Sequence, residues 1–236
     1  MLRSSGFFIH HIIGGHIVKR NIIIIFMIFL ILFGCSTDKD SINMSNLDNS
    51  GVSAETIDKR KAYSNNPQAP DTRSLNNIGQ EFSDEDGKVI LKGISDYNKT
   101  HRIGPIELTL KGIKLVEYIP AMHLIDYFHT FTNNETQFHY VKFHVSIENT
   151  SAETVDFAPV SVLKTDKGEV KGFDDDFYLQ NLYGVLSPGE KKIGELAFIL
   201  DKTSPENLNY ITLTTSDVFN EHRETVNKGK EIKITF

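Results

Sequence analysis

The stretch that decides the fold class is Tyr140-Val141-Lys142-Phe143-His144-Val145-Ser146-Ile147-Glu148. Apolar side chains occupy every second position from Val141 to Ile147, and mostly polar side chains fill the positions between them. This period of two predicts a β-strand with one face in a core and the other face, including His144, toward solvent. We expect the strand to stop at the turn-prone triplet 149–151.

The same alternation continues along the chain. Between residues 106 and 110 every second side chain is apolar, and beyond Gly112 the apolar positions resume with the opposite parity at residues 113–115. A glycine at a change of parity predicts a β-bulge. Residues 155–163 predict a further strand, and Pro159 within it indicates an edge position, because proline cannot donate a ladder hydrogen bond.

Turn sequences divide the C-terminal half into short segments. The stretches 166–168 (Asp-Lys-Gly) and 187–190 (Ser-Pro-Gly-Glu) are rich in residues that favour turns. The strands expected around these turns lie at residues 169–171, 193–200, 211–213 and 232–236. Many short strands, frequent turns and a single plausible helix predict an all-β protein built as an antiparallel sandwich.

Composition limits the possible functions. The chain has a formal net charge of −6 and one cysteine, Cys35. A lone cysteine excludes a disulfide-stapled scaffold, so stability has to come from an ordinary hydrophobic core. Residues 86–236 carry 17 basic and 22 acidic side chains without a basic stripe. This acidic balance argues against nucleic acid as a partner.

The N-terminal region predicts where in the cell the protein is located. A basic pair, Lys19 and Arg20, precedes the apolar run from Ile22 to Phe33, which ends at Gly34-Cys35. This order predicts a secretory signal in residues 1–35. Its end resembles the bacterial lipoprotein box, which implies cleavage before Cys35 and lipidation of that residue with acyl chains such as palmitate. The expected location is the extracellular face of the cell membrane.

Two other interpretations of this region remain open. A membrane-spanning helix needs about 20 apolar residues, and extending the run back to Phe7 would place Lys19 and Arg20 inside the hydrocarbon, which is costly. The second concerns residues 1–17, which lie unusually far upstream of the basic pair. We hypothesise that they are a start-site artefact and that the native protein begins at Val18.

Residues 36–86 predict a disordered polar tether. Polar and acidic clusters dominate it, and its apolar residues are isolated and follow no period. Such a segment buries too little apolar surface to offset its ordering entropy. The folded domain is therefore expected at residues 87–236.

Three segments carry a family resemblance: Gly104 to Ile113, Val145 to Ser151, and Leu186 to Glu190 followed by residues 194–198. In this order, after a lipoprotein box, they resemble the telokin-like, immunoprotective-antigen-type domain of Gram-positive surface lipoproteins. The resemblance covers about residues 88–236 and implies an immunoglobulin-like β-sandwich at the cell surface. The family has no agreed activity, so the resemblance implies a fold and an address without a reaction.

The histidines suggest one alternative function. His123, Asp126 and His129 follow one another at spacings of three, which places them on one side of a short helix, with His139 and His144 nearby in sequence. Imidazole and carboxylate groups are the ligands that zinc prefers. The alternative is therefore a metal-binding surface lipoprotein, set against the interpretation of these residues as ordinary surface histidines.

An aromatic stretch is the other candidate. Tyr118, Tyr127, Phe128 and Phe131 lie in a connection between strands, where polar residues are normal. They form either a binding surface or, as we favour, the inner face of a helix that caps one end of the sandwich. The acidic run 174–176 lacks the spacing of a calcium loop and is expected to be solvated.

These observations together predict a non-catalytic protein. The sequence contains no familiar catalytic motif and no phosphate-cradling glycine loop, and we expect no cofactor. The expected function is a lipid-anchored extracellular immunoglobulin-like domain that acts as a binding or structural module. Its expected partners are the membrane, through the lipid, and a protein or cell-envelope ligand.

Overall fold

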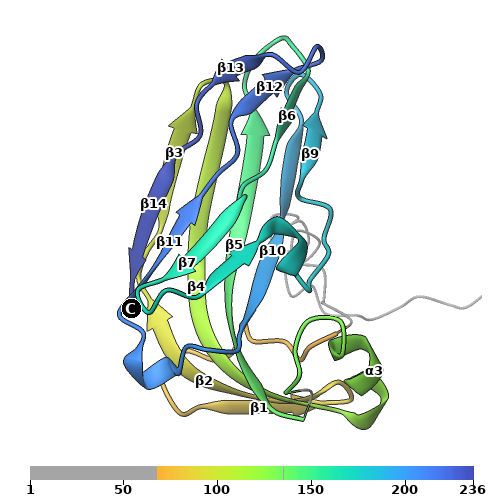
Figure 1. Cartoon of the computed structure of the whole chain (residues 1–236), viewed down its shortest axis with the longest axis vertical. Coiled ribbons are helices and arrows are strands. Elements are labelled where there is room, and N and C mark those ends of the chain that lie inside the picture. The colour runs from red at the N-terminus through yellow and green to blue at the C-terminus, as the bar shows by residue number, and fades with distance from the viewer. Residues whose placement is uncertain (1–67, 135) are drawn as a thin grey trace, which may run out of the picture. The chain divides into compact units, whose positions relative to one another are not determined.

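The computed structural model describes residues 68–134 and 136–236, so Cys35, the predicted signal and residues 36–67 lie outside the described part of the chain. The described part is mostly β-strand (Figure 1). Its first elements are β1 (Glu81–Asp84), β2 (Gly87–Ser95), β3 (Lys99–Ile103), β4 (Ile106–Pro120), η1 (Met122–Leu124), α3 (Ile125–Phe128), β5 (Phe138–Asn149), β6 (Val155–Phe157) and β7 (Val162–Thr165). The remaining elements are β8 (Val170–Gly172), η2 (Phe173–Asp175), β9 (Gly184–Leu186), β10 (Lys191–Leu200), η3 (Pro205–Asn207), β11 (Tyr210–Thr214), β12 (Val218–Asn220), β13 (Thr225–Asn227) and β14 (Glu231–Thr235).

The first layer is one antiparallel sheet with the order β1-β2-β4-β5-β10, in which β3 also pairs with β4. The alternating stretch of the sequence forms β5, between β4 and β10. Gly112 has a φ of 61°, and the register between β4 and β5 shifts between Lys111 and Lys114. The predicted bulge is confirmed, and it turns the apolar side chains on either side of it toward the same core.

The second layer consists of two four-stranded sheets, β13-β12-β6-β9 and β14-β11-β7-β8. The chain passes from one of these sheets to the other between β6 and β7 and again between β11 and β12. Backbone hydrogen bonds link these two connections: Ser216 N–H donates to the Ala158 carbonyl (3.0 Å), and Ser161 N–H donates to the Thr214 carbonyl (2.7 Å). Pro159 lies in the connection between β6 and β7. Both strands are internal, so the predicted edge position is wrong. Proline is tolerated here because the chain changes sheets and needs no ladder hydrogen bond.

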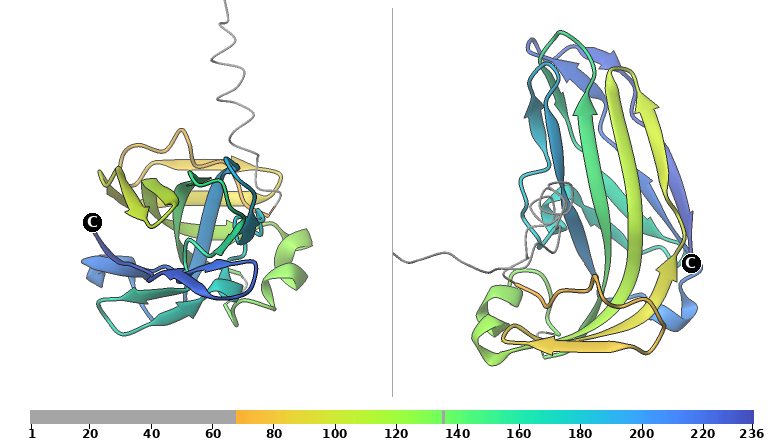
Figure 2. Two further views of the ribbon diagram at one scale, coloured as in Figure 1. Left: turned by 90° about the horizontal axis from the view of Figure 1, so that it is seen from above. Right: turned by 180° about the vertical axis from the view of Figure 1, so that it is seen from behind.

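The main core lies between these two layers. Apolar side chains of β4, β5 and β10 meet those of β6, β7, β11, β12 and β14, and nearly all of them are fully buried. Seen from above in Figure 2, β2 and β4 lie on the opposite side from the blue C-terminal strands. The predicted antiparallel, all-β sandwich is confirmed.

A second apolar cluster covers part of the outer face of the first sheet. Its members come from that sheet, from α3 and from residues outside any strand, and they include Ala69, Leu75, Val116, Phe128, Phe138, Tyr140 and Phe177. The outer face of β5 is therefore solvated along only part of its length. Lys142 and His144 are buried, so the prediction that His144 faces solvent is wrong.

Residues 68–80, here called the strap, belong to the folded domain. Ala69, Thr72 and Leu75 are buried. The strap then joins the sheet, because Gly79 N–H donates to the Leu91 carbonyl at 2.8 Å. The predicted boundary at residue 86 is therefore wrong, since the strap packs on the first sheet and residues 81–84 form strand β1, which pairs with β2. Over the described residues, no helix has the length and apolarity needed to span a bilayer.

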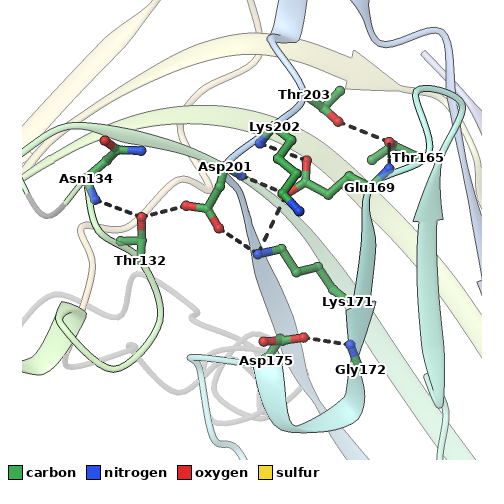
Figure 3. A network of polar contacts seen from close by, with 10 residues as sticks. All are labelled: Thr132, Asn134, Thr165, Glu169, Lys171, Gly172, Asp175, Asp201, Lys202 and Thr203. Atoms are coloured by element: carbon green, nitrogen blue, oxygen red, sulfur yellow. Dashed lines mark hydrogen bonds and ion pairs between the residues drawn. The ribbon is translucent and has the colours of Figure 1, made fainter.

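A polar network ties the second layer to the loops that follow β10 and α3 (Figure 3). Lys171 Nζ lies 2.8 Å from Asp201 Oδ2 and 3.6 Å from Glu169 Oε1. The Glu169 carboxylate also accepts the N–H groups of Asp201 and Lys202. Thr132 Oγ1 donates to Asp201 Oδ1 at 2.6 Å. Each carboxylate in this network is hydrogen-bonded, as buried charges require.

Candidate functional site

The predicted aromatic binding surface is not a surface. Tyr118 and Phe128 are fully buried in the second cluster. The Phe128 ring packs against the rings of Phe138, Tyr118 and Phe177, with centroids 4.8 to 5.6 Å apart. The interpretation of Phe128 as the inner face of a helix is confirmed, but this helix covers the outer face of the first sheet and not the end of the sandwich, and the binding interpretation is wrong for both residues.

Tyr127 and Phe131 line the rim of the same cluster and are half-buried. The Tyr127 hydroxyl donates to the Phe177 carbonyl at 2.5 Å, and its ring packs against Phe128 and Phe131. Burial raises the pKa of Tyr127 to about 12. These contacts give both residues a structural role in covering the second cluster on the outer face of the first sheet.

The candidate metal ligands point to different partners. His129 Nδ1 lies 3.8 Å from Asp126 Oδ1, whereas His123 Nε2 lies 3.6 Å from Asp86 Oδ1. His139 pairs with Glu117 at 3.4 Å. Among the described residues no three histidine, cysteine or acidic side chains converge as a metal site would require.

The acidic run is only partly solvated. Asp174 is exposed, but Asp176 is buried and its Oδ1 accepts the N–H groups of Tyr178 and Ala197. Burial raises the pKa of Asp176 to about 6. The expected solvated loop is therefore wrong for Asp176, which fixes residues 176–178 against the edge strand β10.

A hollow on the outer face of the first sheet is lined mainly by charged and polar side chains. It has a volume of about 370 Å³ and lies beside the second cluster. We call it the basic hollow; its lining residues are Thr72, Arg73, Lys111, Gly112, Lys114, Lys142, His144 and Glu195. The strap, β4, β5 and β10 each contribute, so the site exists only in the folded domain.

Lys114 is the central cation of the basic hollow. It is buried, and its Nζ donates to the Thr72 carbonyl of the strap at 2.7 Å. No carboxylate of residues 68–134 or 136–236 lies within ion-pair distance of it. Burial, and next the charge of Lys142, lower the pKa of Lys114. The fold therefore holds a desolvated ammonium group without a directly paired anion.

Lys142 lies beside Lys114, because the two residues are direct partners in the register of β4 and β5. Lys142 Nζ forms an ion pair with Glu195 Oε1 at 2.8 Å and lies 5.5 Å from the centroid of the Tyr178 ring. Like charges directly opposite each other on a sheet are destabilising. The Glu195 carboxylate neutralises the charge of the Lys142 ammonium group, and the charge of Lys114 has no directly paired carboxylate among the described residues.

The pKa of His144 is sensitive to the positive charges of the basic hollow. Burial, and next the charge of Lys111, lower the pKa of His144 to about 4, so its imidazole is neutral at physiological pH. Lys111 is the register partner of His144 across β4 and β5. The ring thus lies among cations and contributes no charge of its own.

Thr72 supplies an unused hydrogen-bonding group. Its side chain is 1% exposed, and its hydroxyl has no hydrogen-bond partner among the residues described. Buried hydroxyl groups normally have a partner, because leaving one unpaired is costly. Thr72 lines the basic hollow, so the unpaired hydroxyl belongs to the residue whose carbonyl holds the Lys114 ammonium group.

The charges of the basic hollow sum to an excess of positive charge. Its four lysine and arginine side chains face Glu195 and, from the strap, Asp71, which Arg73 binds at 2.6 Å. Burial raises the pKa of Asp71, but hydrogen bonds from Arg73 and the charge of Lys142 outweigh this and lower it. Inside a domain of net negative charge, the arrangement is suited to binding an anion.

A second hollow of about 360 Å³ lies at the far end of the sandwich, where binding loops are common. Pro105 and Val155 line it together with residues of the β12–β13 hairpin such as Asn220. The Asn220 side chain is occupied within that hairpin, since its Oδ1 accepts the N–H groups of residues 222 and 224. This hollow is less suited to a charged ligand than the basic hollow, because it gathers no buried charge.

The sequence analysis missed the basic hollow for a physical reason. Lys142 and His144 alternate with apolar residues and look like a solvated strand face. Their burial depends on the strap and on residues 176–178, which are distant in sequence. The available signal was the basic pair Lys111 and Lys114 around the Gly112 bulge, which the register places opposite His144 and Lys142.

Comparisons with known proteins now place the chain. No protein-family model matches it. Solved structures similar to it include a protein of unknown function from Listeria monocytogenes, with a TM-score of 0.45 and 14% identity, covering 64% of this chain and 87% of that one. Another is the yjhA protein of Bacillus subtilis, with a TM-score of 0.33 and 14% identity, covering 58% and 96%.

A curated relative is similar over nearly its whole length. The uncharacterized protein YdhF of Bacillus subtilis strain 168 is 36% identical over 236 residues, which cover 92% of this chain and 100% of the relative. Identity of this level over both chains shows common descent. The chain therefore belongs to the YdhF family.

Proposed function

We propose that the protein is a lipid-anchored, extracellular and non-catalytic binding module that captures an anionic ligand in the basic hollow. The address rests on the basic pair, the apolar run and Gly34-Cys35, which resemble a lipoprotein signal. The binding function rests on one observation above all. Lys114 is buried beside Lys142, and of the two ammonium groups only that of Lys142 has a directly paired carboxylate, Glu195.

A purely structural origin explains this arrangement poorly. A buried charge is costly unless it is paired, and an apolar residue of similar volume at position 114 would avoid that cost. An anion that binds between the strap and the sheet would compensate both lysines. Thr72 supports this proposal, because it lines the same hollow and carries a buried hydroxyl without a partner among the residues described.

Calorimetric titration of the full chain in detergent with sodium sulfate at low ionic strength tests the binding function. We expect saturable binding that Lys114→Gln weakens at least tenfold. The matched control is Lys191→Gln, which removes an exposed lysine from the neighbouring strand β10, outside the hollow, and leaves affinity unchanged. Equal loss in both variants, or no saturable binding by the wild type, would overturn the proposal.

The anchor is tested separately. Wild-type protein is expected to fractionate with membranes and to carry acyl chains, whereas Cys35→Ala abolishes lipid labelling. Stable anchoring needs two lipid signals, because a single acyl chain binds only marginally. An intact mass that shows Cys35 unmodified in the mature protein contradicts the proposed address and leaves the binding function standing.

A further inference from the structure

Every charged group that faces the basic hollow can be assigned to an element. The strap contributes Asp71 and Arg73, and Glu195 comes from β10. The remaining ones belong to the central strand pair: Lys111 and Lys114 on β4, and Lys142 and the neutral His144 on β5. Four cations and two carboxylates leave a net charge of +2.

From this charge we infer that the ligand group is a phosphate dianion, either free phosphate or the terminal phosphate of a phosphomonoester. The inference rests on the proposed function and names the class of anion. A phosphomonoester carries about −1.5 to −2 charges at pH 7, because its second pKa is about 6. A carboxylate or a phosphodiester carries −1 and leaves a desolvated positive charge behind.

The placement of the donors also favours a tetrahedral group. Lys114 and Lys142 approach from adjacent strands, and the unpaired Thr72 hydroxyl belongs to the strap residue whose carbonyl Lys114 contacts. Three phosphate oxygens each accept hydrogen bonds, so donors that arrive from different elements are all used. A planar carboxylate is matched best by the fork of a single arginine. Arg73 is not available for this, because it binds Asp71 through both its backbone N–H and its guanidinium group.

The surrounding surface argues against a long polyanion. Further along the same outer face, Glu107 of β4 lies directly opposite Glu148 of β5. Glu148 pairs with Lys191 at 3.1 Å, and Arg102 of β3 lies directly opposite Glu107, so these charges balance. A phosphodiester chain leaving the hollow in this direction meets no excess of positive charge. The structure is thus matched to a discrete terminal phosphate.

The test compares ligands of similar size and different charge. We titrate the full chain at pH 7.5 with methyl phosphate, dimethyl phosphate, sulfate and acetate. The two dianions, methyl phosphate and sulfate, are expected to bind at least tenfold more tightly than the two monoanions. Inorganic phosphate is the fifth ligand: tighter binding than methyl phosphate assigns free phosphate, and the reverse order assigns a monoester.

A pH series separates the ligand from the protein. Between pH 7.5 and 5.5 most of the methyl phosphate dianion takes up one proton and becomes a monoanion, because its second pKa is about 6. The imidazole of His144 stays neutral in this window, because burial lowers its pKa to about 4. We therefore expect methyl phosphate to bind several-fold more weakly at pH 5.5 and sulfate to bind equally at both values.

Variants test whether the ligand binds in the basic hollow. The ligand series then distinguishes a wrong ligand class from a wrong proposed function. Thr72→Val keeps the shape of the strap and is expected to weaken methyl phosphate binding about tenfold, and Lys114→Gln is expected to weaken it more. Lys191→Gln is the control. If sulfate and methyl phosphate bind no better than acetate, the phosphate class is wrong and the binding module stands. If none of the five ligands binds, the proposed function itself is wrong.

Discussion

Two lysines in this domain are buried to a similar degree and are treated very differently by their surroundings. Lys171 of β8 lies between two carboxylates, Asp201 at 2.8 Å and Glu169 at 3.6 Å (Figure 3). Lys114 of β4 contacts a carbonyl oxygen and lies opposite a second lysine, Lys142.

The difference separates a structural site from a binding site. Around Lys171 the chain supplies each partner itself, so the network joins two loops to the second layer and needs nothing from outside. Around Lys114 the chain leaves positive charge uncompensated and a hydroxyl unpaired. A buried charge without an internal partner is informative because it costs stability, and a ligand is the simplest compensation.

A substitution in the apolar part of the same sheet face gives a reference value for the loss of stability expected at the two lysines. Phe128→Ala is expected to cost about 4 kcal/mol through lost burial and the cavity left among three rings. Denaturant unfolding of the full chain measures it, with Met122→Ala as the control, since Met122 is 87% exposed. A loss below about 1 kcal/mol would contradict the described packing and the structural role of residues 118–131.

Lys171→Met tests the structural side of the comparison. Removing one partner of a buried ion pair leaves the carboxylates uncompensated, so we expect a loss of about 3 to 4 kcal/mol in the free energy of unfolding. Lys164→Met, at an exposed position of the adjacent strand β7, is the control and is expected to change it by less than about 0.5 kcal/mol. Equal effects of the two substitutions would show that the network does not stabilise the fold.

His144 tests the potential of the basic hollow through pH. Its pKa is lowered in the folded state, so the stability it contributes is present above its unfolded pKa of 6.5 and is lost as pH falls toward 4. Over this range the wild type is expected to lose about 2 to 3 kcal/mol more than His144→Gln. Parallel unfolding titrations measure the difference, and identical slopes would show that His144 is not held neutral.

Lys114→Met is expected to have the smallest effect on stability, less than about 1 kcal/mol. The variant loses the hydrogen bond to Thr72 but also removes a desolvated charge opposite Lys142, and the two changes oppose each other. Unfolding of the full chain without added anion measures it. A loss as large as that of Lys171→Met would break the comparison and identify Lys114 as a structural residue.

The local parts of the fold followed from the sequence. The strand 138–149, the Gly112 bulge and the turns near residues 167 and 188 were predicted because each depends on side chains a few positions apart. The chain also belongs to the class of sandwich that these strands predict. Periodicity and turn chemistry act within a single segment, which is why they can be recognised without the rest of the chain.

The site could not be predicted in the same way. Lys142, His144 and Asp176 have polar side chains in polar patterns, and they are buried because segments distant in sequence lie over them. The strap was assigned to the tether, since its few apolar residues show no period. Pro159 was assigned to an edge because a break between two sheets of one layer has no local signal. Burial of a polar residue is a property of the tertiary arrangement.

The strap has a mechanical consequence. Among the described residues, a pull on the strap toward the N-terminus acts first on Gln68 and Ala69. The contacts that resist this pull include the hydrogen bond of Lys114 to the Thr72 carbonyl, that of the Tyr118 hydroxyl to the Gln68 carbonyl, and the burial of Ala69 and Leu75. An anion bound between the strap and the sheet adds to this set. The force needed to peel the strap from the domain therefore depends on ligand occupancy, and a pulling measurement with and without anion reads it directly.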